Sequence, residues 1–288
     1  MSSPPLFECA GCGFRRETTW NPGLCPACLR RWNIRTMRVA TDRGPVVDDG
    51  EVVSLSDVDA AEVPRIQIGG PFAAIDRILG GGIVDGRGVY LLAGAAGIGK
   101  STLLMMIMQR LALLGFLVLY VTAEESIRQV RLRSKRFGQF DPRLLIVREN
   151  DLENILARAA EHEAKVLVID SLNTLVVRSP ATGEEFEVGS AGAVSTAARM
   201  IVDFATEEDI PIFIINHVTK AGIAAGPNSA AHAADVVLFF EGIEGEAERS
   251  VSVPSKSRFG PIGGRAVFTI SEAGLSPVEA ESQPGAAS

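Results

Sequence analysis

The stretch LLAGAAGIGKSTLLMMIMQRL, Leu91–Leu111, decides the fold that we expect for this chain. It opens as an apolar strand, passes through a glycine-rich segment, and continues with the apolar spacing of a helix. Residues Gly94 to Ser101 match the pattern GxxxxGK[ST]. A loop that wraps a polyphosphate turns its amide groups inward, and glycine permits the backbone conformations that this requires. The stretch therefore predicts a phosphate-binding loop between a strand and a helix.

The side chains of this loop have expected roles in binding ATP and Mg²⁺. Lys100 should reach the β- and γ-phosphates, and the Ser101 hydroxyl should ligate Mg²⁺. A second strand, KVLVID, ends in Asp170, which should hold the metal through water. A chance glycine-rich turn is the alternative, but the strand before the loop and the helix after it argue against chance. The expected nucleotide-binding residues are Gly94, Gly97, Gly99, Lys100, Ser101, Thr102 and Asp170.

Hydrolysis requires a residue that orients or deprotonates the attacking water. The segment LYVTAEES places Glu124 and Glu125 at the end of the strand that follows the helix of the phosphate-binding loop. Ligands bind at the carboxyl ends of strands in open α/β sheets, so either carboxylate could face the site. We favour Glu124 as the base. Glu125 then serves the start of the next helix or the outer shell of the metal.

All four cysteines lie near the start of the chain, as two CxxC pairs separated by twelve residues. Thiolates at this spacing can close around a tetrahedral ion. Two disulfides are the alternative, and they are typical of secreted small domains. We expect structural Zn²⁺, with no open coordination position for catalysis. The expected ligands are Cys9, Cys12, Cys25 and Cys28.

The composition allows a large core: 47% of the 288 residues are hydrophobic and 22% are charged. No apolar run is long enough to span a bilayer, and the N-terminus lacks the features of a signal peptide, so we expect a cytoplasmic protein with no membrane partner. We expect a zinc ribbon over 1–32, a linker over 33–64, an ATPase core over 65–273 and a disordered tail over 274–288. The net charge of −7 argues only weakly against binding to DNA.

Within the core, short β-branched runs alternate with helical patterns, which predicts an α/β fold with a mostly parallel sheet flanked by helices. The final strands have no helix between them and should form antiparallel hairpins. Helices are expected to follow Gly99, Glu125, Asp151 and Gly192. Strands are expected at 88–93, 116–122, 144–147, 165–170, 211–216, 236–240, 250–253 and 266–270.

Several segments together resemble one family. LGGGIVDGRGVYLLAGAAGIGKSTLL, YVTAEES, VIDS, NHVTKAGIAAGP and SKSRFGP occur in the order found in RadA/Sms proteins, the bacterial RecA-like DNA-repair ATPases. The resemblance covers about residues 6–272 and includes the four-cysteine ribbon. Its most specific element is the combination of ribbon, phosphate-binding loop and KSRFG, Lys256–Gly260, which is similar to the family's KNRFG motif.

The resemblance implies a RecA-type P-loop ATPase core that assembles as a hexameric ring and hydrolyses ATP at subunit interfaces. It also implies movement on single-stranded or branched DNA, branch migration in recombination, and a recombinase or replication protein as partner. His217 matches the strand end at which RecA-type proteins sense the γ-phosphate. Lys256 and Arg258 match the motif that reaches a neighbouring subunit's nucleotide or the DNA.

The sequence also departs from the family pattern. The family usually continues into a Lon-protease-like domain, whereas this sequence ends at Ser288. Ala95 and Ala96 stand where the loop commonly has an acidic residue and proline, Ser257 replaces asparagine, and Asn216 replaces glycine. The two alanines leave the phosphate-binding loop intact, whereas Ser257 and Asn216 weaken the match around Lys256, Arg258 and His217.

No stretch of the sequence forms an obvious DNA-binding surface. The loop 177–194 is acidic, and the loop 219–232 offers Lys220. The basic run between Arg128 and Arg136 is more typical of a solvated helix face. A RecA-like regulator or adaptor that uses ATP as an assembly switch therefore remains the alternative function, and a small-molecule kinase is a weaker third.

Overall fold

The computed structural model describes residues 64–179, 182–217, 229–243 and 247–278, together with the backbone of three short strands nearer the N-terminus. The chain divides into two compact units, Met1–Val63 and Pro64–Ser288. In the first unit, β1 (Leu6–Cys9) lies between β2 (Arg15–Glu17) and β3 (Ile34–Thr36), and both pairings are antiparallel.

The expected zinc site falls in this first unit. Cys12, Cys25 and Cys28 lie outside the described residues, and of Cys9 only the backbone is described. Zinc binding therefore stays a prediction from the cysteine spacing. Among the residues whose side chains are described, no cluster of three metal-binding groups occurs.

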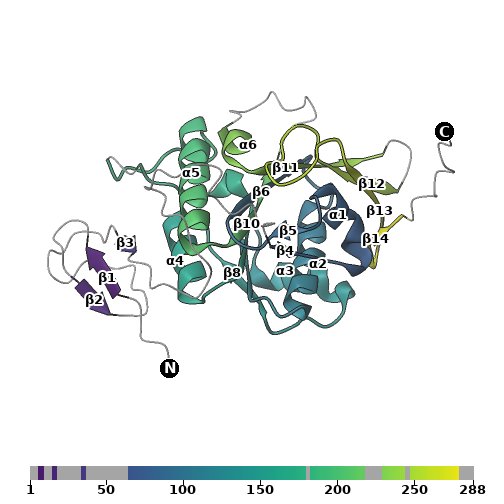
Figure 1. Ribbon diagram of the computed structural model, residues 1–288, viewed down its shortest axis with the longest axis horizontal. Helices are drawn as coiled ribbons and strands as arrows, with labels where there is room; N and C mark the ends of the chain where they lie inside the picture. Colours follow the sequence, from purple (N-terminus) through teal and green to yellow (C-terminus); the bar gives the residue numbers. More distant parts are fainter. Residues whose placement is uncertain are drawn as a thin grey trace, which may run out of the picture. The chain divides into compact units, whose positions relative to one another are not determined.

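The second unit is built on a nine-stranded sheet in the order β14-β13-β12-β11-β6-β10-β9-β7-β8 (Figure 1). The strands from β11 to β8 in this order run parallel, and β11 to β14 form the expected antiparallel meander. The bounds are β6 (Gly88–Gly94), β7 (Val118–Thr122), β8 (Leu144–Arg148), β9 (Val166–Asp170), β10 (Pro211–His217), β11 (Val236–Gly242), β12 (Glu248–Ser252), β13 (Arg265–Ser271) and β14 (Gly274–Pro277).

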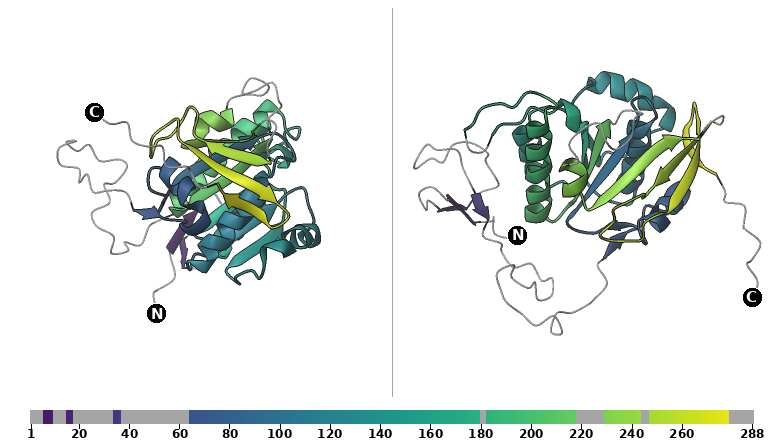
Figure 2. Two further views of the ribbon diagram at one scale, coloured as in Figure 1. Left: turned by 90° about the vertical axis from the view of Figure 1, so that its right-hand side faces the viewer. Right: turned by 90° about the horizontal axis from the view of Figure 1, so that it is seen from above.

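Helices cover both faces of this sheet. In Figure 1, α4 and α5 lie on one side of the sheet and α1, α2 and α3 on the other, and the second view in Figure 2 again separates α5 from α2 across the strands. The helices are α1 (Ala73–Ile78), α2 (Lys100–Leu113), α3 (Ile127–Ser134), α4 (Leu152–Glu161), α5 (Ala191–Glu208) and α6 (Ser229–Ala233). A two-stranded ladder pairs β4 (Arg65–Ile66) with β5 (Ile83–Val84), and 3₁₀ turns occur at Gly70–Phe72, Lys135–Phe137 and Leu172–Thr174.

Successive side chains along each strand alternate between the two faces of the sheet, and this divides the hydrophobic core into two clusters. On β6, Tyr90 and Leu92 pack in the cluster that holds α1 and α2, whereas Val89 and Leu91 pack in the cluster that holds α4 and α5. Successive side chains of a strand point to opposite faces, so a parallel strand covered on both faces is apolar throughout. This explains why all seven residues of β6 are buried.

Two features differ from the sequence-based expectation. The short elements α1, α6, β4 and β5 were not predicted, because they are too brief to show a period. The sheet also continues into the expected tail: β14 pairs with β13, and Leu275 is only 2% exposed. Burial of this one apolar side chain favours the added strand. None of the helices in the described part of the chain could cross a membrane.

Candidate nucleotide-binding site

The loop between β6 and α2 has the backbone expected of a phosphate cradle. Gly97 and Gly99 adopt φ angles of 73° and 112°, in the left-handed region that glycine favours. A Cβ on Gly94 would collide with the carbonyl oxygen of Phe240, whereas nothing lies within 4 Å of one on Gly97. The loop is thus tightly fixed where it leaves the sheet and open at its tip, as a bound phosphate requires.

Lys100 is the first residue of α2, directly after this loop, and is only 3% exposed. Its ammonium donates to the carbonyl oxygens of Gly94 at 2.8 Å and Ala95 at 2.7 Å, and it lies 3.1 Å from Nδ1 of His217. Burial lowers the pKa of Lys100, and the carboxylates of Asp170 and Glu124 oppose that shift. A buried ammonium held by neutral acceptors suits a triphosphate, which would supply the missing negative charge.

Asp170 ends β9 next to this lysine and is held by a buried tyrosine. The Tyr120 hydroxyl donates to Oδ2 of Asp170 at 2.7 Å. Burial, followed by the charge of Asp170, raises the pKa of Tyr120 well above its usual value, so its hydroxyl stays protonated. This bond leaves Oδ1 of Asp170 for a metal ion, and a carboxylate oxygen of this kind fits magnesium.

Glu124 and Glu125 have different surroundings. Oε1 of Glu124 accepts from the Ser171 hydroxyl at 2.5 Å and lies 3.6 Å from Nε2 of His217. Oε1 of Glu125 instead accepts from Arg133 at 2.8 Å, and its backbone bonds the Thr122 hydroxyl. Of the two carboxylates, only that of Glu124 faces Lys100 and His217, while that of Glu125 is paired with Arg133 of α3.

His217 lies at the end of β10, between Lys100 and Glu124. Burial, followed by the charge of Lys100, lowers the pKa of His217, so the neutral imidazole is favoured. Its Nδ1 then accepts from Lys100, and Nε2 carries the proton toward Glu124. The side chain of Asn173 accepts from the backbone N–H of His217 at 3.0 Å. Asn173 was not predicted, and no motif in the sequence points to it.

Lys256 and Arg258 lie elsewhere, beside the start of β11. The Arg258 guanidinium contacts Oδ1 of Asp235 at 2.8 Å, and Oδ2 of Asp235 accepts from the backbone N–H of Val89 at 2.9 Å. The Lys256 ammonium donates to the carbonyls of Ala231 and His232, at the C-terminal end of α6. Burial, followed by the nearby Arg258 charge, lowers the pKa of Lys256.

These two cations cannot reach the phosphate-binding loop of their own chain. Val89 is at the start of β6 and Gly94 at its end. The intervening residues span roughly 17 Å at about 3.3 Å per residue. The structure therefore brings together Lys100, Asp170, Glu124 and His217, and it places Lys256 and Arg258 at the opposite end of the strand.

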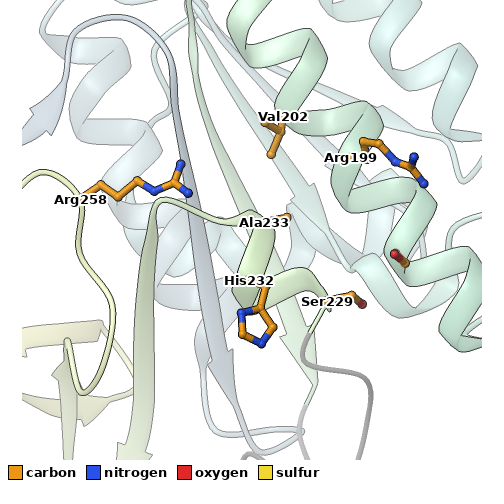
Figure 3. A pocket seen from close by; sticks show the side chains of 7 residues that line it. Arg199, Val202, Ser229, His232, Ala233 and Arg258 are labelled. Carbon is orange, nitrogen blue, oxygen red and sulfur yellow. The ribbon is translucent and has the colours of Figure 1, made fainter.

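A cavity of about 470 Å³ opens beside Arg258. Arg258 enters it from the KSRFG segment, His232 from α6 and Arg199 from α5 (Figure 3). Ser195, Val202, Ser229 and Ala233 complete the lining. No sequence pattern groups Arg199 and His232 with Arg258, because these residues meet only through the packing of α6 on α5.

In the segments considered for contact with DNA, several described basic residues are engaged within the chain. Arg178 in the first loop pairs with Asp151 and Glu185. In the basic run, Arg133 pairs with Glu125, while Arg131 and Arg136 lie over phenylalanine rings. These contacts favour a structural role for most of the run. Lys220 lies outside the described residues.

Comparisons with known proteins agree with this geometry. A family model described as an AAA domain matches residues 57–222. The chain is 37% identical to the DNA repair protein RadA of Aquifex aeolicus over 274 residues, and 34% identical to that of Escherichia coli over 286 residues. Each alignment covers 94% of this chain and 59% of the relative, so the chain spans about three fifths of their length.

The fold also matches a solved structure. A KaiC-like protein from Pyrococcus horikoshii superposes with a TM-score of 0.59 at 22% identity. The match covers 75% of this chain and 99% of that one. At this identity the likeness supports the fold alone, and it agrees with a RecA-like P-loop core.

Proposed function

The chain belongs to the AAA domain family, and on this premise we propose that it binds and hydrolyses ATP in a DNA-repair process of the RadA type. The observation that carries the proposal is the meeting of Lys100, Asp170, Glu124 and His217 at the carboxyl ends of four strands. Open α/β sheets bind their ligands at this edge. Similarity to RadA supports the repair role.

In the proposed reaction, the loop amides and Lys100 would hold the triphosphate, while Ser101 and Asp170 would hold Mg²⁺. When bound, this ion would supply positive charge that offsets the charge of the phosphates. Glu124 orients the attacking water and accepts its proton, because its carboxylate is the one that faces the lysine and histidine. His217 lies in contact with Lys100, so a γ-phosphate that attracts this lysine also changes the surroundings of the histidine.

We further propose that Lys256 and Arg258 act on a nucleotide held by a neighbouring copy of the chain. Their distance from the loop of their own chain supports action across a subunit boundary. A cation supplied in this way stabilises charge in phosphoryl transfer and couples hydrolysis to assembly. A head-to-tail contact of this kind generates a ring where the rotation between copies closes, and the resemblance to RadA supports a ring as the assembly.

The test is the rate of ATP hydrolysis of the full chain and of Lys100→Ala, with and without single-stranded DNA, at two salt concentrations. We expect Lys100→Ala to abolish turnover and the exposed control Lys165→Ala to retain it. We also expect DNA to stimulate the wild type, less so at high salt, because phosphate contacts weaken as salt rises. Near-normal turnover by Lys100→Ala would refute the proposed site.

The second candidate function is a nucleotide-dependent assembly switch. The neutralisation of Arg178 by Asp151 and Glu185 favours it, since this loop then offers no free cation to a phosphate backbone. The same experiment separates the two functions. A rate that does not respond to DNA, together with assembly that depends on ATP, would support the switch over the DNA motor.

We also propose that Cys9, Cys12, Cys25 and Cys28 bind one structural zinc ion. Support comes from their spacing, and a closed four-thiolate site would stabilise a unit too small to fold alone. Zinc should be found at about one ion per chain by elemental analysis of purified protein. Cys25→Ser with Cys28→Ser should lose it, and retention of zinc by this variant would contradict the assignment.

A further inference from the structure

We propose that Tyr120 is a positioning residue that orients Asp170, one of the two expected Mg²⁺ ligands of the site. This inference rests on the proposed ATP site and adds a residue that no sequence motif marked. In the sequence Tyr120 is part of an apolar strand, two residues before the end of β7. Its role becomes visible only from the neighbours that the sheet gives it.

The register of the sheet places the tyrosine diagonally across from the aspartate. Thr122 of β7 lies beside Asp170 of β9, and Tyr120 lies beside Val168. Side chains two residues apart share a face, so Tyr120 and Asp170 both point toward the face covered by α2. A diagonal pair is within reach of an aromatic side chain, and here the hydroxyl meets Oδ2 of Asp170 at 2.7 Å.

The direction of this hydrogen bond gives the contact a chemical meaning. A carboxylate only accepts, so the single hydroxyl proton of Tyr120 is donated to Oδ2 of Asp170. The bond holds the carboxylate in one orientation, and Oδ1 of Asp170 is left for a metal ion.

Burial keeps this arrangement in place. Tyr120 is 0% exposed, so water does not compete for its hydroxyl. Groups that hydrogen-bond to metal ligands orient them, and their loss typically lowers metal affinity by about 10- to 100-fold. We therefore expect the hydroxyl to affect Mg²⁺ binding selectively and nucleotide binding without metal very little.

The chain supplies a matched control for a merely structural role. It contains two tyrosines, and the other, Tyr90, is also buried at 1% exposure. The Tyr90 hydroxyl accepts from the backbone N–H of Val84 at 2.8 Å, and its ring stacks on Phe213. Tyr90→Phe and Tyr120→Phe thus each remove one buried hydroxyl, but only the second removes a bond to an expected Mg²⁺ ligand.

The experiment measures binding of a non-hydrolysable ATP analogue to the full chain, titrated with Mg²⁺ and repeated in EDTA. For Tyr120→Phe we expect the Mg²⁺ concentration at half-maximal binding to rise about tenfold, with affinity in EDTA unchanged. Tyr90→Phe should lower the Tm but leave the Mg²⁺ dependence unchanged. A Mg²⁺ dependence of Tyr120→Phe within about twofold of the wild type would overturn the inference.

A second measurement keeps the test valid if Tyr120→Phe fails to fold. Both tyrosines of the wild type are replaced by 3-fluorotyrosine, and the two ¹⁹F resonances are assigned with Tyr90→Phe. The Tyr120 resonance should move when Mg²⁺ is added to the nucleotide complex, while that of Tyr90 stays. An unmoved Tyr120 resonance in a chain that binds the Mg²⁺–nucleotide complex would reject the role. Failure of the wild type to bind that complex would instead reject the proposed function.

Discussion

Asp235 ties Arg258 to the strand that leads into the phosphate-binding loop. One carboxylate oxygen contacts the guanidinium at 2.8 Å, and the other accepts from the N–H of Val89 at 2.9 Å. Arg258 also donates its backbone N–H to the carbonyl of Asp235. A single side chain therefore fixes both the start of β6 and the KSRFG segment.

This double role predicts different outcomes for two substitutions of Asp235. Asn can still accept from Val89, so Asp235→Asn loses only the ion pair, which is worth about 0–1 kcal/mol because Arg258 is 60% exposed. Asp235→Ala also leaves a buried N–H unpaired, at a further cost of about 1–3 kcal/mol. Urea unfolding of both variants measures the difference. Equal stabilities would show that the bond to Val89 contributes little.

Action of Arg258 across a subunit boundary predicts complementation. Arg258→Ala and Lys100→Ala should each be inactive alone in ATP hydrolysis. In a mixture of the two variants, a Lys100→Ala chain supplies an intact Arg258 to a neighbouring Arg258→Ala chain, whose phosphate-binding loop is intact. About one quarter of the interfaces in an equal, random mixture are then complete.

The measurement is the ATPase rate of the mixture at a protein concentration high enough for assembly. Mixing Lys100→Ala with Glu124→Gln serves as the control, because both changes lie in the same proposed half-site and cannot complete each other through Arg258. Absence of activity in the first mixture, despite assembly, would contradict action in trans.

Gly80 and Gly260 come from segments that are distant in the sequence and pack closely against each other. A side chain added at Gly260 should therefore disturb the packing of the KSRFG segment. A Cβ on Gly260 would lie 2.8 Å from the carbonyl oxygen of Leu79, and one on Gly80 would lie 2.9 Å from Cα of Gly260. Gly260→Ala should therefore destabilise the fold by about 1–3 kcal/mol. Gly242→Ala is the control, since its nearest neighbour is at 3.5 Å, and should change stability by less than about 0.5 kcal/mol. Equal unfolding midpoints would contradict the close approach.

The sequence predicted those parts of this fold that depend on the pattern of residues within one short segment. The phosphate-binding loop, the expected helix after Gly99 and the strands 88–93 and 236–240 all appear within two residues of the expected bounds. Residue spacing alone carries these features, because each depends on one continuous run of chain.

The contacts that shape the site were not predicted, because they depend on which strands are neighbours. The Tyr120 hydroxyl contacts Asp170 only because β7 pairs with β9 in one register. The Asn173 side chain likewise accepts a hydrogen bond from the backbone N–H of His217, at the end of β10. Asp235 likewise bonds Val89 because β11 lies beside β6. A one-residue shift would turn each side chain to the other face of the sheet, and no local pattern encodes that choice.

The different surroundings of Glu124 and Glu125 predict different kinetic effects. Glu124→Gln should bind ATP normally but hydrolyse it about 10²- to 10⁴-fold more slowly, because a general base is lost. Glu125→Gln should keep near-normal turnover and lose at most about 1 kcal/mol of stability with its bond to Arg133. Single-turnover hydrolysis and equilibrium nucleotide binding distinguish the two effects. A larger loss of turnover in Glu125→Gln would reverse the assignment.

His217 predicts a pH dependence of stability that its removal should reduce. Burial, followed by the charge of Lys100, lowers the pKa of His217 in the folded chain. The unfolded histidine, with a pKa of about 6.5, therefore binds a proton at a pH where the folded one does not. The free energy of unfolding falls as the pH drops through that region, because the unfolded state takes up more protons.

His217→Gln tests this, since glutamine offers Lys100 a neutral acceptor that does not titrate. The difference in unfolding free energy, wild type minus variant, should become less favourable to the wild type between about pH 7 and pH 5. Between about pH 7 and pH 8 it should stay constant, because the imidazole is neutral in both states. Urea unfolding across this range provides the measurement. A difference that grows in favour of the wild type at acidic pH would mean that the folded chain stabilises the imidazolium, against the lowered pKa.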